Sequence, residues 1–324
     1  MVVRLRSGIA FPASPPGIPS SFDRADLHIE RWRYYTRLIR SLYLHVRALP
    51  YRPDYQIYGE DDLGVRAFKE RGWHRFRLSD NGVARLTGAV APMLTELRAL
   101  HDSTPPDERT FNHSGVALTS VDHPNARALL EDELRASCGE LMDRLLKERV
   151  RIGFVKLAYF DAQDRGMFDY GAGTGAMAKY SPWHLDMNIN ELKVNLYLSE
   201  VGVEQGPMHY VTGSHLLHVQ ALLDRAIIHA HRWAAGFGFA DSWMNTDKAL
   251  AVFHSLPSWF QRKNIIGDAF GDSWPQFERD FASRVETFLG PPGTAVLFES
   301  LGLHQGGFVT SGSRVAIQVN LFSS

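Results

Sequence analysis

The pattern of hydrophobic residues changes near Arg151, and this change constrains the fold more than any other feature of the chain. Before Arg151, apolar residues recur at the i, i+3, i+4 spacing of helices. The predicted helices are 26–49, 81–100 and 125–148. After Arg151, short runs alternate apolar with polar residues, which is typical of strands. The predicted strands are 154–160, 192–199, 208–211, 294–298 and 314–322, and two more helices are expected at 216–235 and 275–289.

Helices followed by strands predict an α+β protein with an antiparallel core, most simply a double-stranded β-helix of the jelly-roll or cupin-like kind with flanking helices. We expect a single domain over 23–324. In it, 23–150 is a helical flank, and 151–324 is the β-helix core with a long helical insertion at about 216–290. Residues 1–22 are rich in Pro and Ser, which predicts a disordered arm.

Composition excludes several classes of function. Lys and Arg (35) balance Asp and Glu (36), so no net field draws the chain to nucleic acid or to an anionic membrane. No apolar run approaches the roughly 20 residues that span a bilayer. Cys138 is the only cysteine, which excludes an intrachain disulfide and a thiolate metal cluster. We expect a cytoplasmic protein that acts on a small molecule, without a nucleic-acid or membrane partner, and with its oligomeric state left open.

A His-Leu-Asp step offers two candidate metal ligands. His184 and Asp186 would share one face of a strand, because alternate strand residues point the same way. His304, between the last two predicted strands, could supply the third ligand. Two imidazoles and one carboxylate form the facial triad that suits non-haem Fe(II) and leaves coordination positions open. Alternatively, a lone His-x-Asp step among 14 histidines has no role, and His304 is an ordinary histidine in a glycine-rich turn.

The last predicted strand has a polar face and an apolar face. Arg314, Ala316, Gln318 and Asn320 alternate with an apolar set, which is Val315, Ile317, Val319 and Leu321. This pattern is expected of a barrel wall that lines a cavity. An arginine there offers a fork of donors that matches a carboxylate. The alternative for Arg314 is a surface arginine at the start of a strand.

These motifs, in this order, resemble the phytanoyl-CoA dioxygenase family of Fe(II)/2-oxoglutarate-dependent oxygenases over residues 150–324. The matching segments are His184-Leu185-Asp186, then Gly206-Pro207 followed by Gly213-Ser214-His215, then His304 ten positions before Arg314. The resemblance implies that His184, Asp186 and His304 hold the catalytic iron. It also implies that Arg314 binds the distal carboxylate of 2-oxoglutarate. His215 is left out of the metal site, and Thr212 departs from the proline that many members have there.

The resemblance implies further contacts on the same wall. Asn195 falls where the family often places a side chain beside the cosubstrate, and Lys156 is a weaker candidate for that role. The alternative for both is a polar side chain in solvent, which is the usual state of a strand lysine. Trp183 and Tyr180 could line the substrate pocket, or could serve packing alone.

The implied reaction is hydroxylation of a small-molecule C–H bond, with O2 as cosubstrate and with conversion of 2-oxoglutarate to succinate and CO2. The Asp186 carboxylate favours oxygen insertion over halogenation. Desaturation, cyclisation or epimerisation with the same cofactors is an alternative outcome. Two rivals are a catalytically inactive jelly-roll protein that binds a metal or ligand, and a Zn(II) hydrolase, which would not explain Arg314.

Overall fold

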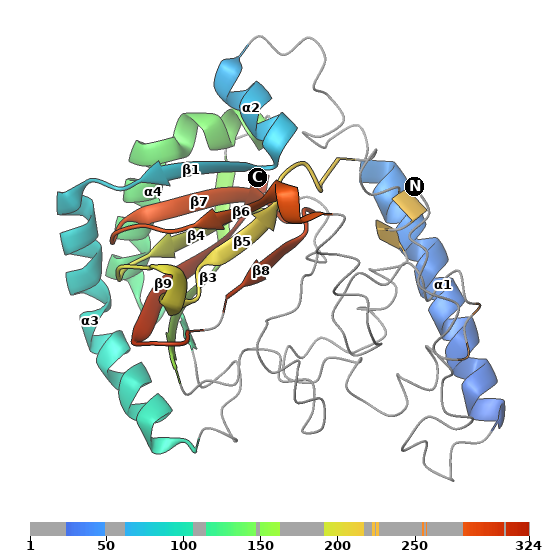
Figure 1. Cartoon of the computed structure of the whole chain (residues 1–324), viewed down its shortest axis with the longest axis horizontal. Helices are drawn as coiled ribbons and strands as arrows, with labels where there is room; N and C mark the ends of the chain where they lie inside the picture. Colours follow the sequence, from blue (N-terminus) through green and yellow to red (C-terminus); the bar gives the residue numbers. More distant parts are fainter. Residues whose placement is uncertain are drawn as a thin grey trace.

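The structure, a computed structural model, describes residues 24–48, 62–105, 115–146, 150–162, 191–216, 222–223, 225–226, 255, 257, 281–307 and 309–323. Its helices are α1 (Arg24–Ala48), α2 (Leu63–Arg71), α3 (Asp80–Ser103) and α4 (Pro124–Leu146), with 3-10 turns η3 (Val203–Gln205) and η6 (Ala282–Arg284). Its strands are β1 (Trp73–Arg77), β2 (Gly115–Ala117), β3 (Val150–Asp161), β4 (Glu191–Tyr197), β5 (Met208–Val211), β6 (Val285–Phe288), β7 (Thr294–Glu299), β8 (His304–Gly306) and β9 (Ser313–Ser323) (Figure 1).

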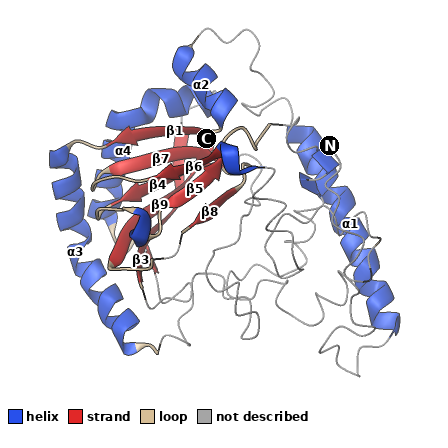
Figure 2. Cartoon of the chain, in the orientation of Figure 1, coloured by secondary structure: helices blue, strands red, loops and turns tan. Residues whose placement is uncertain are grey.

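The strands form two antiparallel sheets (Figure 2). The larger has the order β1-β7-β4-β9-β3-β2, and the smaller has the order β6-β5-β8. From β4 onward the chain passes to the smaller sheet for β5 and β6, returns for β7, crosses again for β8 and returns for β9. This alternation between two sheets is a double-stranded β-helix, which confirms the predicted α+β jelly-roll class.

The smaller sheet packs on one face of the larger sheet, which we call the inner face. Tyr197 of β4 ties the two together: its hydroxyl donates to the Phe288 carbonyl (3.1 Å) and accepts from the Met208 N–H (2.9 Å). Met208, Tyr210 and Phe288 of the smaller sheet pack there against side chains of β7. The inner face is therefore closed at the β4–β7 end by buried apolar contacts.

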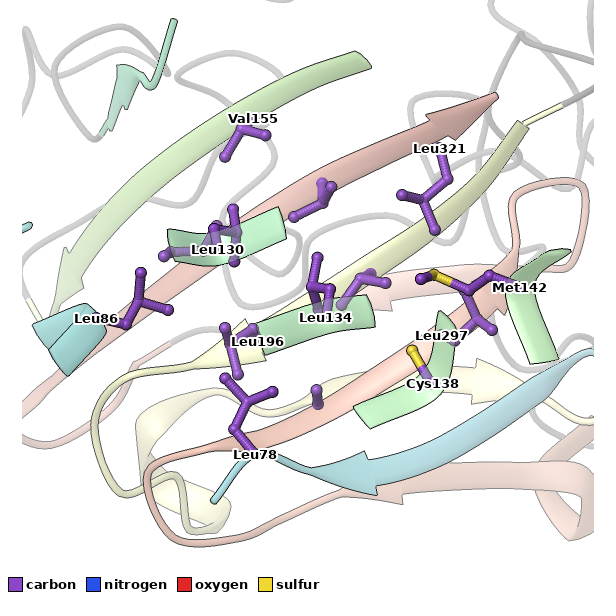
Figure 3. Close-up of a cluster of buried hydrophobic side chains, with 14 of the residues drawn as sticks. Leu78, Leu86, Leu130, Leu134, Cys138, Met142, Val155, Leu196, Leu297 and Leu321 are labelled. Atoms are coloured by element: carbon purple, nitrogen blue, oxygen red, sulfur yellow. The ribbon is translucent and has the colours of Figure 1, made fainter. Parts of the chain in front are cut away.

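The opposite face of the larger sheet packs against α3 and α4. Leu86 of α3 and Leu130 and Leu134 of α4 are fully buried against the sheet, as is Leu297 of β7 (Figure 3). All four apolar residues predicted for one face of the last strand belong to this core: Val315, Ile317, Val319 and Leu321. Each such side chain contributes about 1.5–3 kcal/mol on burial, so the alternation of β9 is strongly fixed.

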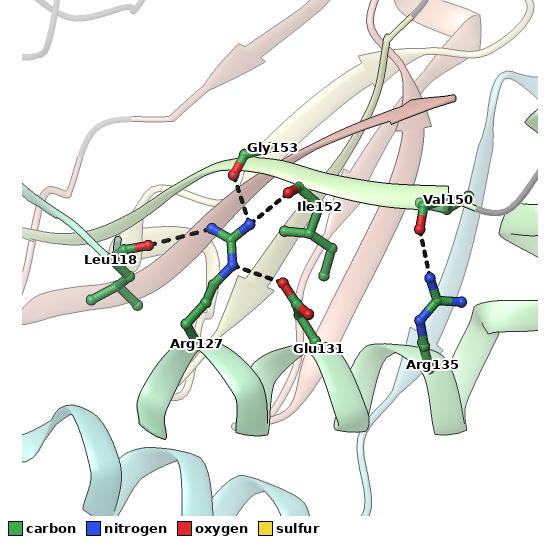
Figure 4. A network of polar contacts seen from close by, with 7 residues as sticks. All are labelled: Leu118, Arg127, Glu131, Arg135, Val150, Ile152 and Gly153. Atoms are coloured by element: carbon green, nitrogen blue, oxygen red, sulfur yellow. Dashed lines mark hydrogen bonds and ion pairs between the residues drawn. The ribbon is translucent and has the colours of Figure 1, made fainter. Parts of the chain in front are cut away.

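Arg127 of α4 compensates for an irregularity in β3. The register between β3 and β9 shifts between Ile152 and Val155. Arg127 Nη2 donates to the carbonyls of Ile152 (2.6 Å) and Gly153 (2.8 Å), while its Nη1 donates to the Leu118 carbonyl (3.3 Å) (Figure 4). Because partly buried carbonyls still need hydrogen-bond donors, the guanidinium replaces ladder partners that the shifted register withdraws.

The N-terminal flank contains two short strands besides its helices, and the sequence patterns did not predict these strands. It contributes β1 and β2, and these two strands lie at the two ends of the larger sheet. α1 and α3 match their predicted ranges closely, and Ser79 caps α3 by accepting from the Gly82 N–H (3.0 Å). Not every apolar residue that recurs at helical spacing in α1 is buried, since Trp32 is 71% exposed. The side chains that α1 buries are Tyr34, Leu38, Ser41 and His45.

The helix predicted for 275–289 is wrong at its C-terminal end. Residues 285–288 form β6, which pairs with β5 from Met208↔Phe288 to Val211↔Val285. The segment Val-Glu-Thr-Phe holds two β-branched residues and alternates apolar with polar side chains. Its local pattern is therefore compatible with either a helix or a strand, and pairing with β5 selects the strand. The core therefore resumes at Val285, before the predicted boundary near 290.

Several predictions lie outside the described residues. They are the arm at 1–22, most of the helix at 216–235 and most of the insertion. None of the helices in the described ranges combines the length and hydropathy that a membrane-spanning segment needs.

Candidate functional site

A row of polar side chains crosses the inner face of the larger sheet. Gln318 of β9 lies opposite Lys156 of β3 on one side and opposite Asn195 of β4 on the other. The apolar neighbours of these residues point to the helices, so all three side chains point to the inner face. The structure thus brings together two predicted site residues. It adds Gln318, whose position four residues after Arg314 on the same face was the signal that could have identified it.

Lys156 is 3% exposed, so the alternative of a solvated strand lysine is wrong. Its side chain lies against Gly115 of β2, where any Cβ would collide with the lysine Cε. Burial lowers the pKa of Lys156 to about 6. At neutral pH the amine is therefore largely uncharged, and a carboxylate placed beside it would favour its protonation.

Arg314 is buried rather than a surface residue at a strand start. Its guanidinium carbon lies 4.9 Å from the ring centroid of Phe160, which is its partner on β3. Nη1 donates to the Gly307 carbonyl (3.1 Å), just beyond the end of β8. A ring on one side and a carbonyl on the other hold the guanidinium between the two sheets.

His304 is the first residue of β8 and is also buried. Its Nδ1 donates to the Gly302 carbonyl (2.8 Å), and its ring lies against Phe298 with the ring centroids 4.9 Å apart. In the neutral imidazole this places the lone pair on Nε2. Metal-ligating histidines typically have the same arrangement, with the other ring N–H donated to a carbonyl or carboxylate.

Arg314 and His304 meet on the same side of β8. Gly306 shares a face of this short strand with His304, and a Cβ built on Gly306 would lie 3.9 Å from Nη2 of Arg314. The guanidinium therefore lies beside Gly306, two residues after His304 along the same strand. A nitrogen ligand and a fixed cation on one face of the same strand suit a metal site with a carboxylate-bearing ligand beside it.

The remaining predicted site residues, His184, Asp186, Trp183 and Tyr180, lie outside the described residues, and their roles stay predictions. His215, which the prediction leaves out of the metal site, is buried and donates from Nε2 to the Lys69 carbonyl (2.8 Å). Gly206 and Gly213 adopt φ of 68° and 75°, as expected if they serve turn geometry.

No protein-family model matches the chain, and no curated protein matches it. Among solved structures, the chain is similar to SnoK, a non-heme α-ketoglutarate-dependent carbocyclase from nogalamycin biosynthesis. The identity is 17%, with 82% of this chain and 85% of that chain covered and a TM-score of 0.48.

It is also similar to EctD from S. alaskensis, crystallised with 2-oxoglutarate and 5-hydroxyectoine (15% identity, 79% and 74% covered, TM-score 0.47). A third is SnoN, a non-heme α-ketoglutarate-dependent epimerase from the same biosynthesis as SnoK (14% identity, 79% and 78% covered, TM-score 0.44). At these values the fold assignment rests on the strand order and register of this chain itself.

Proposed function

We propose that the chain is an Fe(II)- and 2-oxoglutarate-dependent oxygenase of the phytanoyl-CoA dioxygenase-like kind. His184, Asp186 and His304 would hold the iron, and Arg314 would bind 2-oxoglutarate. The observation that carries the proposal is the placement of two groups beside β8. The Gly302 carbonyl orients His304, and the Arg314 guanidinium lies beside Gly306, which is on the same face of β8 as His304.

The order of the strands supports this set of ligands. The segment that carries His184 and Asp186 connects β3 to β4, which flank β9 in the larger sheet. β8, which carries His304, is the last strand in the described order of the smaller sheet.

Two imidazoles and one carboxylate fit Fe(II), which, when bound with 2-oxoglutarate, supplies O2 activation coupled to oxidative decarboxylation. The side chains of this protein bind and orient the reactants. Arg314, held between Phe160 and Gly307, would fix the distal carboxylate. The Gly302 carbonyl keeps Nε2 of His304 directed at the metal position.

Lys156 and Asn195 would contribute from the polar row. The alanines Ala158 and Ala316 pair with each other between this row and Arg314, so the shortest side chains of the inner face lie where a short dicarboxylate would fit. A carboxylate near Lys156 would raise the lowered pKa of the amine, and the lysine would take up a proton on binding.

The finer features of the proposal are a small-molecule substrate, hydroxylation as the outcome, a cytoplasmic location, and a single domain over 23–324. Trp183 and Tyr180 would contact the substrate. Desaturation, cyclisation or epimerisation is the alternative outcome, because these reactions share the same cofactors and the same site.

The test begins with metal-free protein under anaerobic conditions. Fe(II) and 2-oxoglutarate together should produce a visible charge-transfer band, and admission of air should produce succinate. His304→Ala and Asp186→Ala should lose both signals. Arg314→Ala should keep Fe(II) binding and require more 2-oxoglutarate, since only the contact to the distal carboxylate is removed.

Two variants serve as matched controls. His74→Ala removes a strand histidine whose side chain stacks beside Phe76 and lies away from the inner face. Arg66→Ala removes an exposed arginine of α2. Both should behave as wild type. Succinate formation by His304→Ala at the wild-type rate would overturn the proposal, and Fe(II) binding with no effect of 2-oxoglutarate would favour a binding protein.

A further inference from the structure

A second cluster of metal-ligating side chains lies on the helix-facing side of the larger sheet. It consists of His101 and Asp102 in the last turn of α3 and Asp161 at the end of β3. Nδ1 of His101 lies 3.5 Å from Oδ1 of Asp102 and 3.8 Å from Oδ2 of Asp161. The three candidate ligand atoms all lie within 4.8 Å of one another.

These separations match the edges of a coordination polyhedron better than hydrogen bonds. An N–H···O bond spans about 2.7–3.2 Å, so both contacts of Nδ1 are longer than that range. Ligands at about 2.1 Å from a tetrahedral ion lie roughly 3.4 Å from one another. All three separations are at most 4.8 Å, and Asp102, whose side chain is 72% exposed, has room to move toward the ion.

The fold holds the other two ligands in place. The His101 side chain is fully buried, and its ring meets Tyr159 edge to face with the centroids 5.0 Å apart. Asp161 is 19% exposed, and its backbone is fixed by pairing with Ser313 of β9. A buried imidazole and a strand-end carboxylate are therefore preorganised, which lowers the cost of binding an ion.

The local charge also favours a cation. Two carboxylates lie against one imidazole, and the guanidinium of Arg98 is placed over the Tyr159 ring. A divalent cation would offset this negative charge.

We propose that His101, Asp102 and Asp161 bind a divalent transition-metal ion of the Zn(II) type, at a site separate from the proposed iron site. One imidazole with two carboxylates suits Zn(II), with water completing the shell, whereas Ca(II) and Mg(II) prefer oxygen ligands alone. The ion would tie the C-terminal end of α3 to the end of β3. The preceding residue there, Phe160, packs against Arg314, so occupancy would stabilise the strand end that positions this arginine.

The test is calorimetric titration of metal-free, full-length protein with Zn(II). All variants are made in a His304→Ala background, so that the proposed iron site contributes less. Asp161→Asn and Asp102→Asn should each weaken Zn(II) binding at the proposed site at least about tenfold. Changes to residues that only contact a ligand already have effects of this size. The matched control is Glu96→Gln, an exposed carboxylate on the same helix, which should leave the titration unchanged.

Co(II) provides a second readout, because its visible spectrum reports coordination directly. Asp161→Asn should change the bound Co(II) spectrum, and Glu96→Gln should not. If Asp161→Asn fails to fold, the exposed Asp102→Asn carries the test alone. Equal Zn(II) titrations for the background, Asp102→Asn and Glu96→Gln proteins would overturn the proposal, as would the absence of Zn(II) binding in the background protein.

Discussion

Nδ1 of His304 donates a 2.8 Å hydrogen bond to the carbonyl of Gly302, two residues earlier in the chain. The turn that makes this contact tolerates no side chain, since a Cβ on Gly302 would collide with the Tyr210 ring. The orientation of the histidine thus depends on a glycine, and the glycine is required by a tyrosine of the neighbouring strand. This dependence gives the first prediction.

Gly302→Ala should lower Fe(II) affinity about 10- to 100-fold, because the displaced carbonyl no longer orients the imidazole. Fe(II) titration beside urea unfolding checks the result. Gly88→Ala is the matched control: its Cβ, at an exposed position of α3, would meet nothing within 4 Å, so it should stabilise the helix by about 1 kcal/mol at most. Wild-type Fe(II) affinity in Gly302→Ala would show that the contact does not govern the ligand.

Lys156→Met should stabilise the ligand-free protein, and this gain should be largest near pH 6 and fall as the pH rises toward 10.5. The folded pKa of about 6 lies below the ordinary value of 10.5, so between them the unfolded chain holds a proton that the folded chain has released. Wild-type stability therefore rises with pH across this window, and the advantage of the methionine should shrink by up to about 1.4 kcal/mol per pH unit. Urea unfolding of both proteins at about pH 7 and about pH 9 measures this, and a pH-independent difference would contradict it.

Arg127→Ala should cost about 2–4 kcal/mol of unfolding free energy, because it leaves the carbonyls of Leu118, Ile152 and Gly153 without a charged donor. The control is Arg66→Ala, which breaks an exposed pair with Glu70 worth less than about 1 kcal/mol. Chemical denaturation compares the two variants. Equal losses would mean that the register shift in β3 does not depend on the guanidinium.

The thiol of Cys138 should be unreactive until the protein unfolds. It lies at a kink in α4 (φ −148°, ψ 16°), is buried, and burial raises its pKa to about 12. The thiolate is the reactive form, so a disulfide reagent should react in urea and not with native protein. Because the chain has one cysteine, the reaction has a single source, and rapid stoichiometric labelling of native protein would refute the prediction.

Sequence patterns predicted the elements whose signal is local. The alternation of residues in β9 predicted which side chains lie on each of its two faces, because successive strand residues point to opposite faces. β6 was missed because Val285–Phe288 satisfies two patterns, and pairing with β5 decides between them. In α1 the helix was predicted, but its buried face depends on packing against Ala226 far along the chain.

The site shows the same limit. His304 and Arg314 could be identified from order and spacing, whereas their mutual placement depends on the strand β8 and on Gly306, which leaves the face open. The burial of Lys156 depends on Gly115 in β2, forty-one positions earlier, and no local signal near the lysine reports that contact.

The pairing of β1 with β7 sets an order of events during synthesis. β1 ends at Arg77, and its partner begins only at Thr294, so most of the chain must leave the ribosome before that edge of the larger sheet can close. Until then, β1 lacks its hydrogen-bonded partner strand β7, as expected of a fold built from distant contacts. A fragment restricted to 151–324 would never receive β1 or β2, and would leave β7 and β3 as open edges prone to associate with other chains.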